Sequence, residues 1–274
     1  MPELTTLLPI VAIMLAIGAF AGVLAGLLGV GGGIVLVPAF FYTFSALGYG
    51  GDYVMQICLA TSLATIIVTS LRSVMSHNRK GAVDWDVLRR WSPGIVIGAL
   101  LGVAVATRLD SSALQALFGT LGIVIGLYMA FGNPNWRLAS AMPGGGVRWG
   151  VSTAIGLLSV LLGIGGGSLA VPTMTLCAYP IHRAVATAAG FGVVLAVPSV
   201  LGFLLVDIPA EMRPPLTIGA VNIPAFLIVI SMTLITAPLG AKLAHAMDPK
   251  PLRRVFALFL MLVALNMLRE LLAA

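Results

Sequence analysis

Two glycine-rich turns are the part of this sequence with the clearest potential for chemistry. The segment Gly29-Val-Gly-Gly-Gly-Ile-Val-Leu-Val-Pro38 recurs as Gly163-Ile-Gly-Gly-Gly-Ser-Leu-Ala-Val-Pro172. Each turn interrupts a long apolar block, and a helix that restarts after a turn directs free N–H groups and a partial positive charge into the break. Such a break suits an anion. The sequence therefore predicts a substrate site that contains Gly31, Gly32, Gly33, Gly165, Gly166 and Gly167.

Close packing between helices is the competing explanation for these glycines. We expect packing alone at the other glycine series, Gly18/Gly22/Gly26, Gly98/Gly102 and Gly122/Gly126. For the duplicated turns we favour a substrate site, because interrupted segments at matching positions of two halves are the best sequence pointer to a transport site.

Hydroxyl groups near the turns add neutral donors, which suit an anion that must bind and then leave. Thr61 and Ser62 lie in the block after the first turn, Thr187 in the equivalent later block, and Ser168 directly after the second turn. A hydrogen bond to the helix's own backbone is the other use of such hydroxyls. Arg72 could attract an anion or extend to the membrane interface, and we favour the interface.

The composition indicates a protein embedded in lipid. Of 274 residues, 59% are hydrophobic and 9% are charged, whereas soluble proteins have about 25% charged residues. The net charge of +6 lies in short loops without interleaved aromatic residues, so we expect no nucleic-acid partner. No HExxH motif, Ser/His/Asp set or Walker lysine is present, so we expect neither an enzyme nor a bound metal or cofactor.

Eight apolar blocks predict an all-α polytopic membrane protein. Most blocks approach or exceed the roughly 20 residues that span a bilayer, and they lack the alternation of barrel strands. We expect two repeats of four blocks, residues 1–135 and 147–274, with a linker at 136–146 and the first block of each half broken at its turn. The blocks are 7–47, 54–78, 92–107, 112–131, 147–179, 182–205, 217–240 and 252–272.

The charges predict that the two halves have opposite orientations. In the first half the basic loop follows the second block, at 79–90, whereas in the second half it follows the seventh block, at 241–254. Basic loops stay on the cytoplasmic side of a membrane. Opposite orientation requires an odd number of crossings per half: five if both pieces of the broken block cross, or three if they form a re-entrant hairpin. Both termini then lie outside, and the loops 79–90, 132–148, 180–183 and 241–254 lie inside.

Several motifs resemble the TauE/SafE family of sulfite exporters and probable membrane transporters. They are GLLGVGGGIVLVP (26–38), ATSLATIIVTSLRSVMSH (60–77), GAVDW (81–85), GLLSVLLGIGGGSLAVP (156–172) and AVAT (184–187). The resemblance covers nearly the whole chain. It implies a multi-pass inner-membrane transporter of a small sulfur-containing anion such as sulfite, sulfoacetate or another organosulfonate. Ala188 stands where a serine is frequent in the family, so the two halves are not expected to play equal roles.

The main hypothesis is therefore an exporter that works by alternating access, with a small anion and the lipid bilayer as its partners. An uncoupled anion channel could use the same turns, and an uptake permease for a different small organic anion is a further alternative. A homo-oligomer is compatible with the sequence. A membrane enzyme or an assembly partner is less favoured, because no catalytic set appears and an assembly partner would not need duplicated broken helices.

Overall fold

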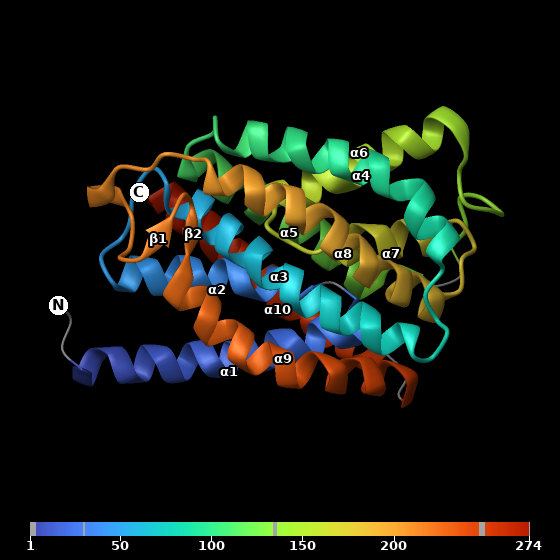
Figure 1. The fold of residues 1–274 in the computed structure, drawn as a ribbon, viewed down its shortest axis with the longest axis horizontal. Helices are drawn as coiled ribbons and strands as arrows, with labels where there is room; N and C mark the ends of the chain where they lie inside the picture. The colour runs from blue at the N-terminus through green and yellow to red at the C-terminus, as the bar shows by residue number, and fades with distance from the viewer. Residues whose placement is uncertain (1–3, 30, 134–135, 247–249, 274) are drawn as a thin grey trace.

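Ten α-helices form most of the computed structural model, which describes residues 4–29, 31–133, 136–246 and 250–273 (Figure 1). Six of the described helices are long and apolar enough to cross a membrane, which confirms the predicted all-α polytopic fold. The helices are α1 Leu4–Leu28, α2 Gly33–Ala46, α3 Val54–Asn78, α4 Trp85–Ala106, α5 Ser111–Phe131, α6 Gly145–Leu161, α7 Gly167–Leu176, α8 Ile181–Leu204, α9 Ile223–Ala246 and α10 Lys250–Ala273.

Capping residues set where several helices begin. The side chain of Asp84 accepts hydrogen bonds from the first turn of α4, and the side chain of Asp110 does the same for α5. The oxygen of the Asn222 side chain accepts a hydrogen bond from Ala225 N in α9. Helix α4 therefore starts at Trp85, before the predicted block at 92–107, because hydropathy alone does not detect a polar first turn.

Each broken block forms two helices, as predicted. Gly29, Gly31, Gly32 and Gly163 have φ angles of 66°, 73°, 79° and 59° in the left-handed region that favours glycine. Helices α2 and α7 contain 14 and 10 residues, so they are about 21 and 15 Å long. Both are shorter than the roughly 30 Å hydrocarbon core of a membrane, so neither crosses it alone.

The first turn folds the chain back into the interior. His77 Nε2 lies 3.1 Å from the carbonyl oxygen of Gly26, which places the end of α1 beside the end of α3. Two turns earlier in α3, Thr69 Oγ1 donates to the carbonyl oxygen of Gly31 at 3.2 Å. Helix α1 thus runs close to the end of α3, whereas α2 begins near the middle of α3 and returns (Figure 1). Both alternatives for the broken block, two crossings or a re-entrant hairpin, stay predictions.

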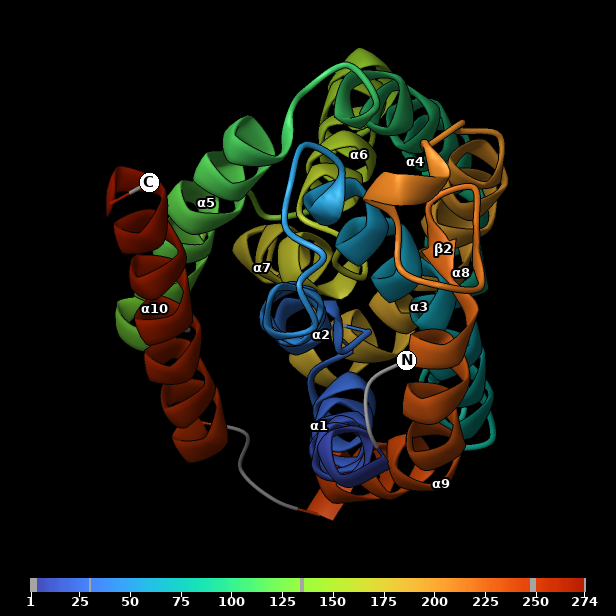
Figure 2. The same cartoon turned by 90° about the vertical axis from the view of Figure 1, so that its left-hand side faces the viewer.

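Packing between helices has the same pattern in both halves. Helix α1 packs on α9 as α6 packs on α4, and α3 packs on α9 as α8 packs on α4. Helices α3 and α8 pack on each other, and so do α5 and α10, which lie beside the other helices in Figure 2. The pattern supports two repeats of five helices. Their inverted orientation in a bilayer stays a prediction.

The loops gather at two ends of the molecule (Figure 1). We call one the basic end: it holds the α3–α4, α5–α6 and α7–α8 loops and exposes Arg79, Lys80, Arg89 and Arg90. The opposite, hairpin end holds the start of α1, the end of α10 and the exposed residues Asp52, Asp110, Asp207 and Glu211. It also holds two short antiparallel strands that the sequence did not predict, β1 Thr217–Ile218 and β2 Val221–Asn222.

Candidate functional site

The two glycine-rich turns contact each other in the interior. A Cβ atom added to Gly33 would lie 2.3 Å from the carbonyl oxygen of Gly163, and one added to Gly31 would lie 3.0 Å from Gly165 Cα. No side chain fits between these backbones. The predicted glycines therefore lie together, at the place where α2 and α7 begin.

Two helix N-termini meet at this contact. Gly32 caps α2 and Gly166 caps α7, and glycine has no side chain that could accept a hydrogen bond from the first turn. The first N–H groups of a helix have no acceptor within that helix, and they carry its partial positive charge. A pair of helix starts without side-chain caps is therefore suited to hold a small anion without a formal positive charge.

Helix α3 holds both turns through buried hydroxyl groups. Ser62 Oγ donates to the carbonyl oxygen of Gly163 at 2.7 Å. Thr69 Oγ1 lies 3.2 Å from the carbonyl oxygen of Gly31 and 3.1 Å from that of Thr65 in its own helix, so these two acceptors share one hydroxyl proton. At the position equivalent to Ser62, α8 has Ala188, which has no hydroxyl to donate. The structure therefore gives Ser62 a positioning role at the contact between the turns.

Ser168 has the one predicted site hydroxyl that lacks a partner in the described part of the chain. It is the second residue of α7 and only 3% exposed, yet its Oγ makes no hydrogen bond. Buried polar groups in proteins nearly always have a partner, so each exception calls for an explanation. This hydroxyl lies directly after Gly166 and Gly167, where a bound anion would supply the missing acceptor.

Thr61 and Thr187 fix the starts of other helices. Thr61 Oγ1 accepts the backbone N–H of Asn222 at 3.0 Å, and Thr187 Oγ1 accepts that of Asp84, also at 3.0 Å. The two bonds are equivalent in the two halves and join α9 to α3 and α4 to α8. The structure thus brings both threonines into the core as positioning residues, and these two hydrogen bonds do not involve the turns.

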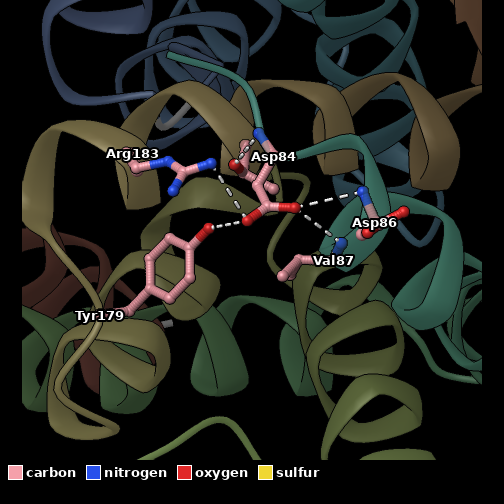
Figure 3. A network of polar contacts seen from close by, with 6 residues as sticks. Asp84, Asp86, Val87, Tyr179 and Arg183 are labelled. Carbon is pink, nitrogen blue, oxygen red and sulfur yellow. Dashed lines mark hydrogen bonds and ion pairs between the residues drawn. The ribbon is translucent and has the colours of Figure 1, made fainter.

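Asp84 is the centre of a polar network at the basic end, which Figure 3 shows in detail. Its Oδ2 accepts from the Tyr179 hydroxyl and lies 3.3 Å from Arg183 Nη2, while its Oδ1 accepts from the backbone N–H groups of Asp86 and Val87. The hydrogen bond from Tyr179 lowers the pKa of Asp84, and the two backbone N–H groups and Arg183 lower it further. Desolvation by burial acts in the opposite direction but does not outweigh them. Burial and the bond to Asp84 raise the pKa of Tyr179 to about 12.

Sequence reasoning missed this network. Tyr179 and Asp84 lie 95 positions apart, and Asp84 entered the sequence analysis only as part of the GAVDW motif. The available signal was the aspartate directly before Trp85, a residue type that caps helix starts, but nothing in the sequence pointed to Tyr179 or Arg183 as its partners. At neutral pH the carboxylate accepts and the tyrosine donates, so the network fixes the α3–α4 loop against the start of α8.

Arg72 does not reach the turns. Its side chain is exposed on α3, next to Leu71 and near Met75, each of which is 47% exposed. Exposed apolar neighbours are typical of a surface that faces lipid, along which a long basic side chain extends to the interface. The exposure of Arg72 agrees with the interface position that the sequence analysis favours.

A separate pocket lies at the basic end. It has a volume of about 400 Å³ and is lined by Arg137, Leu138, Ala139, Ser140 and Ala178. None of these residues belongs to the turns. The pocket is therefore a surface feature of the loops and does not mark the site between α2 and α7.

Comparison with known proteins assigns the chain to a family. Residues 14–267 match the family model described as "Sulfite exporter TauE/SafE". The chain is 30% identical to a probable membrane transporter protein of Haemophilus influenzae, over 94% of this chain and 97% of that one. It is 28% identical to a probable membrane transporter protein of Methanocaldococcus jannaschii, over 97% of each. No solved structure matches it. The chain therefore belongs to the TauE/SafE family of membrane transporters.

Proposed function

We propose that this transporter exports a small sulfur-containing anion, such as sulfite, sulfoacetate or another organosulfonate, by alternating access. The observation that carries the proposal is the meeting of two helix starts without side-chain caps beside the unpartnered hydroxyl of Ser168. Backbone N–H groups of residues 31–33 and 165–167 hold the oxygens of the anion, and Ser168 donates one further hydrogen bond. Neutral donors bind an oxyanion without trapping it.

The turns must separate before an anion can bind between them. In the described conformation they are in contact, and Ser62 joins α3 to the second turn. The units that move are not the two halves of the sequence, because α1 packs on α9 and α4 packs on α6. Instead, one bundle contains α1, α3 and α9, and the other contains α4, α6 and α8, with the turns and the α3–α8 contact between them.

The basic end faces the cytoplasm in this proposal, since basic loops are retained there. The membrane is then the cell inner membrane, with both termini outside. The exposed Arg79, Lys80, Arg89 and Arg90 attract anions to the cytoplasmic end. The position of these basic residues supports export, because they concentrate an anionic substrate on the cytoplasmic side, from which it leaves.

Thermal unfolding of the purified protein with a panel of anions tests the substrate class. A ligand stabilises the state that it binds by RT ln(1 + [L]/Kd), so a substrate well above its Kd raises the Tm. We expect a rise with sulfite or sulfoacetate and none with chloride at the same ionic strength. A rise only with a carboxylate, a cation or a neutral solute would remove the sulfur-anion assignment.

Transport into proteoliposomes separates a carrier from the channel alternative. A carrier shows a saturating flux and counterflow, in which unlabelled substrate inside accelerates uptake of labelled substrate. A channel shows neither. Flux that rises linearly with concentration and has no counterflow would contradict alternating access, even if the anion assignment holds.

A further inference from the structure

A row of buried hydroxyl groups continues along α3 from the turns toward the basic end. Thr65, Thr69, Ser70 and Ser73 are each at most 1% exposed. Residues three or four apart share a face of a helix, so Thr69, Ser73 and His77 form one line. The two ends of this line contact the first turn and the end of α1, through Gly31 and Gly26 respectively.

Ser73 is the member of this row without a partner in the described structure. Thr65 donates to the carbonyl oxygen of Ser62 at 2.6 Å, and Thr69 donates to that of Gly31, but Ser73 Oγ makes no hydrogen bond. Like Ser168, it is a buried donor without an acceptor. It lies one helical turn from both Thr69 and His77, on the basic-end side of the turns.

Small residues of α8 lie against Ser70 and Val74 of α3. A Cβ atom on Gly192 would lie 2.3 Å from Ser70 Oγ, and Val74 packs with Ala186 and Ala189. Small side chains allow two helices to approach closely, and a small displacement of α8 then exposes the hydroxyls of α3. Ser70 therefore lies against Gly192 of α8, while its neighbour Ser73, three residues further along α3, lies on the line that contacts the first turn and α1.

The corresponding stretch of α8 lacks this character. When Thr61 is aligned with Thr187, the residues equivalent to Thr65, Thr69 and Ser70 are Phe191, Leu195 and Ala196. Ser199 is equivalent to Ser73 and equally buried, but its Oγ donates to the carbonyl oxygen of Leu195 at 2.7 Å. The polar row therefore exists only between the turns and the basic end.

We propose that Ser70 and Ser73 form a second anion-binding station, which a small oxyanion occupies between the basic end and the turns. The proposal rests on the transport function proposed above. At this station, neutral hydroxyl donors replace part of the hydration shell of the anion, as the backbone N–H groups do at the turns. An anion attracted by Arg79 and Lys80 then reaches the turns in two short steps, and the contact between α3 and α8 opens on the cytoplasmic side.

Thiol labelling at two equivalent positions tests the station. The variants Ser73→Cys and Ser199→Cys are each made in a background with Cys58→Ala and Cys177→Ser, which removes both native thiols. The probe is methanethiosulfonate ethylsulfonate, a small sulfonate anion, applied from the cytoplasmic side of inverted vesicles. We expect labelling after Ser73→Cys to be about tenfold faster or more than after Ser199→Cys, because the charged end and the polar row of α3 favour the anionic probe.

Two further measurements separate an anion station from a site that holds only water. Sulfoacetate or sulfate should slow labelling of the Ser73→Cys protein, and a cationic probe of the same size should label it more slowly than the anionic one. Equal labelling at both positions, or labelling that is insensitive to anions and to probe charge, would overturn the proposal. The labelling ratio needs no substrate, so it remains readable if the panel of anions disproves the sulfur-anion assignment.

Ser73→Ala gives an independent readout, because it removes no hydrogen bond in the described structure. We expect the variant to bind the anion at the turns as the wild type does, with an unchanged Tm shift, but to transport it several-fold more slowly. The matched control Ser199→Ala should keep the wild-type rate. Unchanged transport by the Ser73→Ala protein would contradict a role in the path.

Discussion

The substitution Ser168→Ala should change the stability of the free protein and its response to ligand in opposite directions. In the free protein the Ser168 hydroxyl is buried without a partner, and such a group costs about 1–3 kcal/mol. Alanine keeps the Cβ and removes the unsatisfied oxygen. We therefore expect the free energy of unfolding without ligand to rise by about 1 kcal/mol, which corresponds to a Tm increase of about 2–4 °C for a chain of this size.

The bound protein should lose the same hydroxyl as a donor. A hydrogen bond to a charged group contributes about 1.5–3 kcal/mol, so the Kd of the anion should rise about tenfold or more. At roughly 100 times the wild-type Kd, the ligand stabilises the wild type by about 2.7 kcal/mol and the variant by only about 1.4 kcal/mol. The variant should thus start at a higher Tm and gain less from the anion.

Thermal unfolding in detergent with a titrated anion measures both effects in one experiment. Ser199→Ala is the control, because Ser199 is a buried serine whose hydroxyl already bonds within its own helix; its ligand response should match that of the wild type. A Ser168→Ala protein that is less stable without ligand would show that the hydroxyl has a structural partner. An unchanged Kd would remove Ser168 from the site.

Three other changes test the surroundings of the site. Gly33→Ala places a Cβ 2.3 Å from the carbonyl oxygen of Gly163 and should reduce stability by about 1–3 kcal/mol or prevent folding. The control Gly150→Ala, with open space around it in α6, should stabilise the protein by up to about 1 kcal/mol. Fluorescence-detected unfolding measures the stability of both variants. Ser62→Ala leaves the buried carbonyl of Gly163 without this donor and should cost about 1–3 kcal/mol in the same assay, so an unchanged Tm would contradict its positioning role. Asp84→Asn keeps a helix cap but removes the charge. Because the folded-state pKa of Asp84 lies below 3.8, the wild type should be the more stable protein above pH 3.8. This stability advantage should vanish as the pH falls through the lowered pKa. A stability difference that does not depend on pH would show that the carboxylate charge does not stabilise the network.

The duplicated turns were the most informative part of the sequence. Their matching positions predicted two repeats and a break in the first block of each, and the structure shows both breaks at the glycines with positive φ. The reason is local: a left-handed backbone inside an apolar block requires glycine, so the break can be read directly from the residues. Helix limits were less predictable, since Asp84 starts α4 within a polar stretch.

The roles of individual hydroxyls could not be read from the sequence. Thr61 and Ser62 are neighbours of the same chemical type, yet Thr61 accepts from Asn222, 161 positions away, while Ser62 donates to Gly163, 101 positions away. Such assignments depend on how α3 is rotated against α9 and the second turn. Ser73, Ser159 and Ser168 are the buried serines in the described part of the chain whose hydroxyls lack a partner, and this lack is a property of the assembled core.

The exchange of packing partners between the halves has a consequence for how the protein is made. Gly18, Gly22 and Gly26 of α1 lie against Val229, Thr233 and Ala237 of α9. Helix α1 leaves the ribosome early, so its glycine surface stays in lipid without its partner until about 200 further residues have been inserted. Neither half can complete its core during translation alone. A fragment that ends after residue 135 should therefore insert but not fold stably, and co-expression of residues 136–274 should restore the structure by supplying α6 and α9.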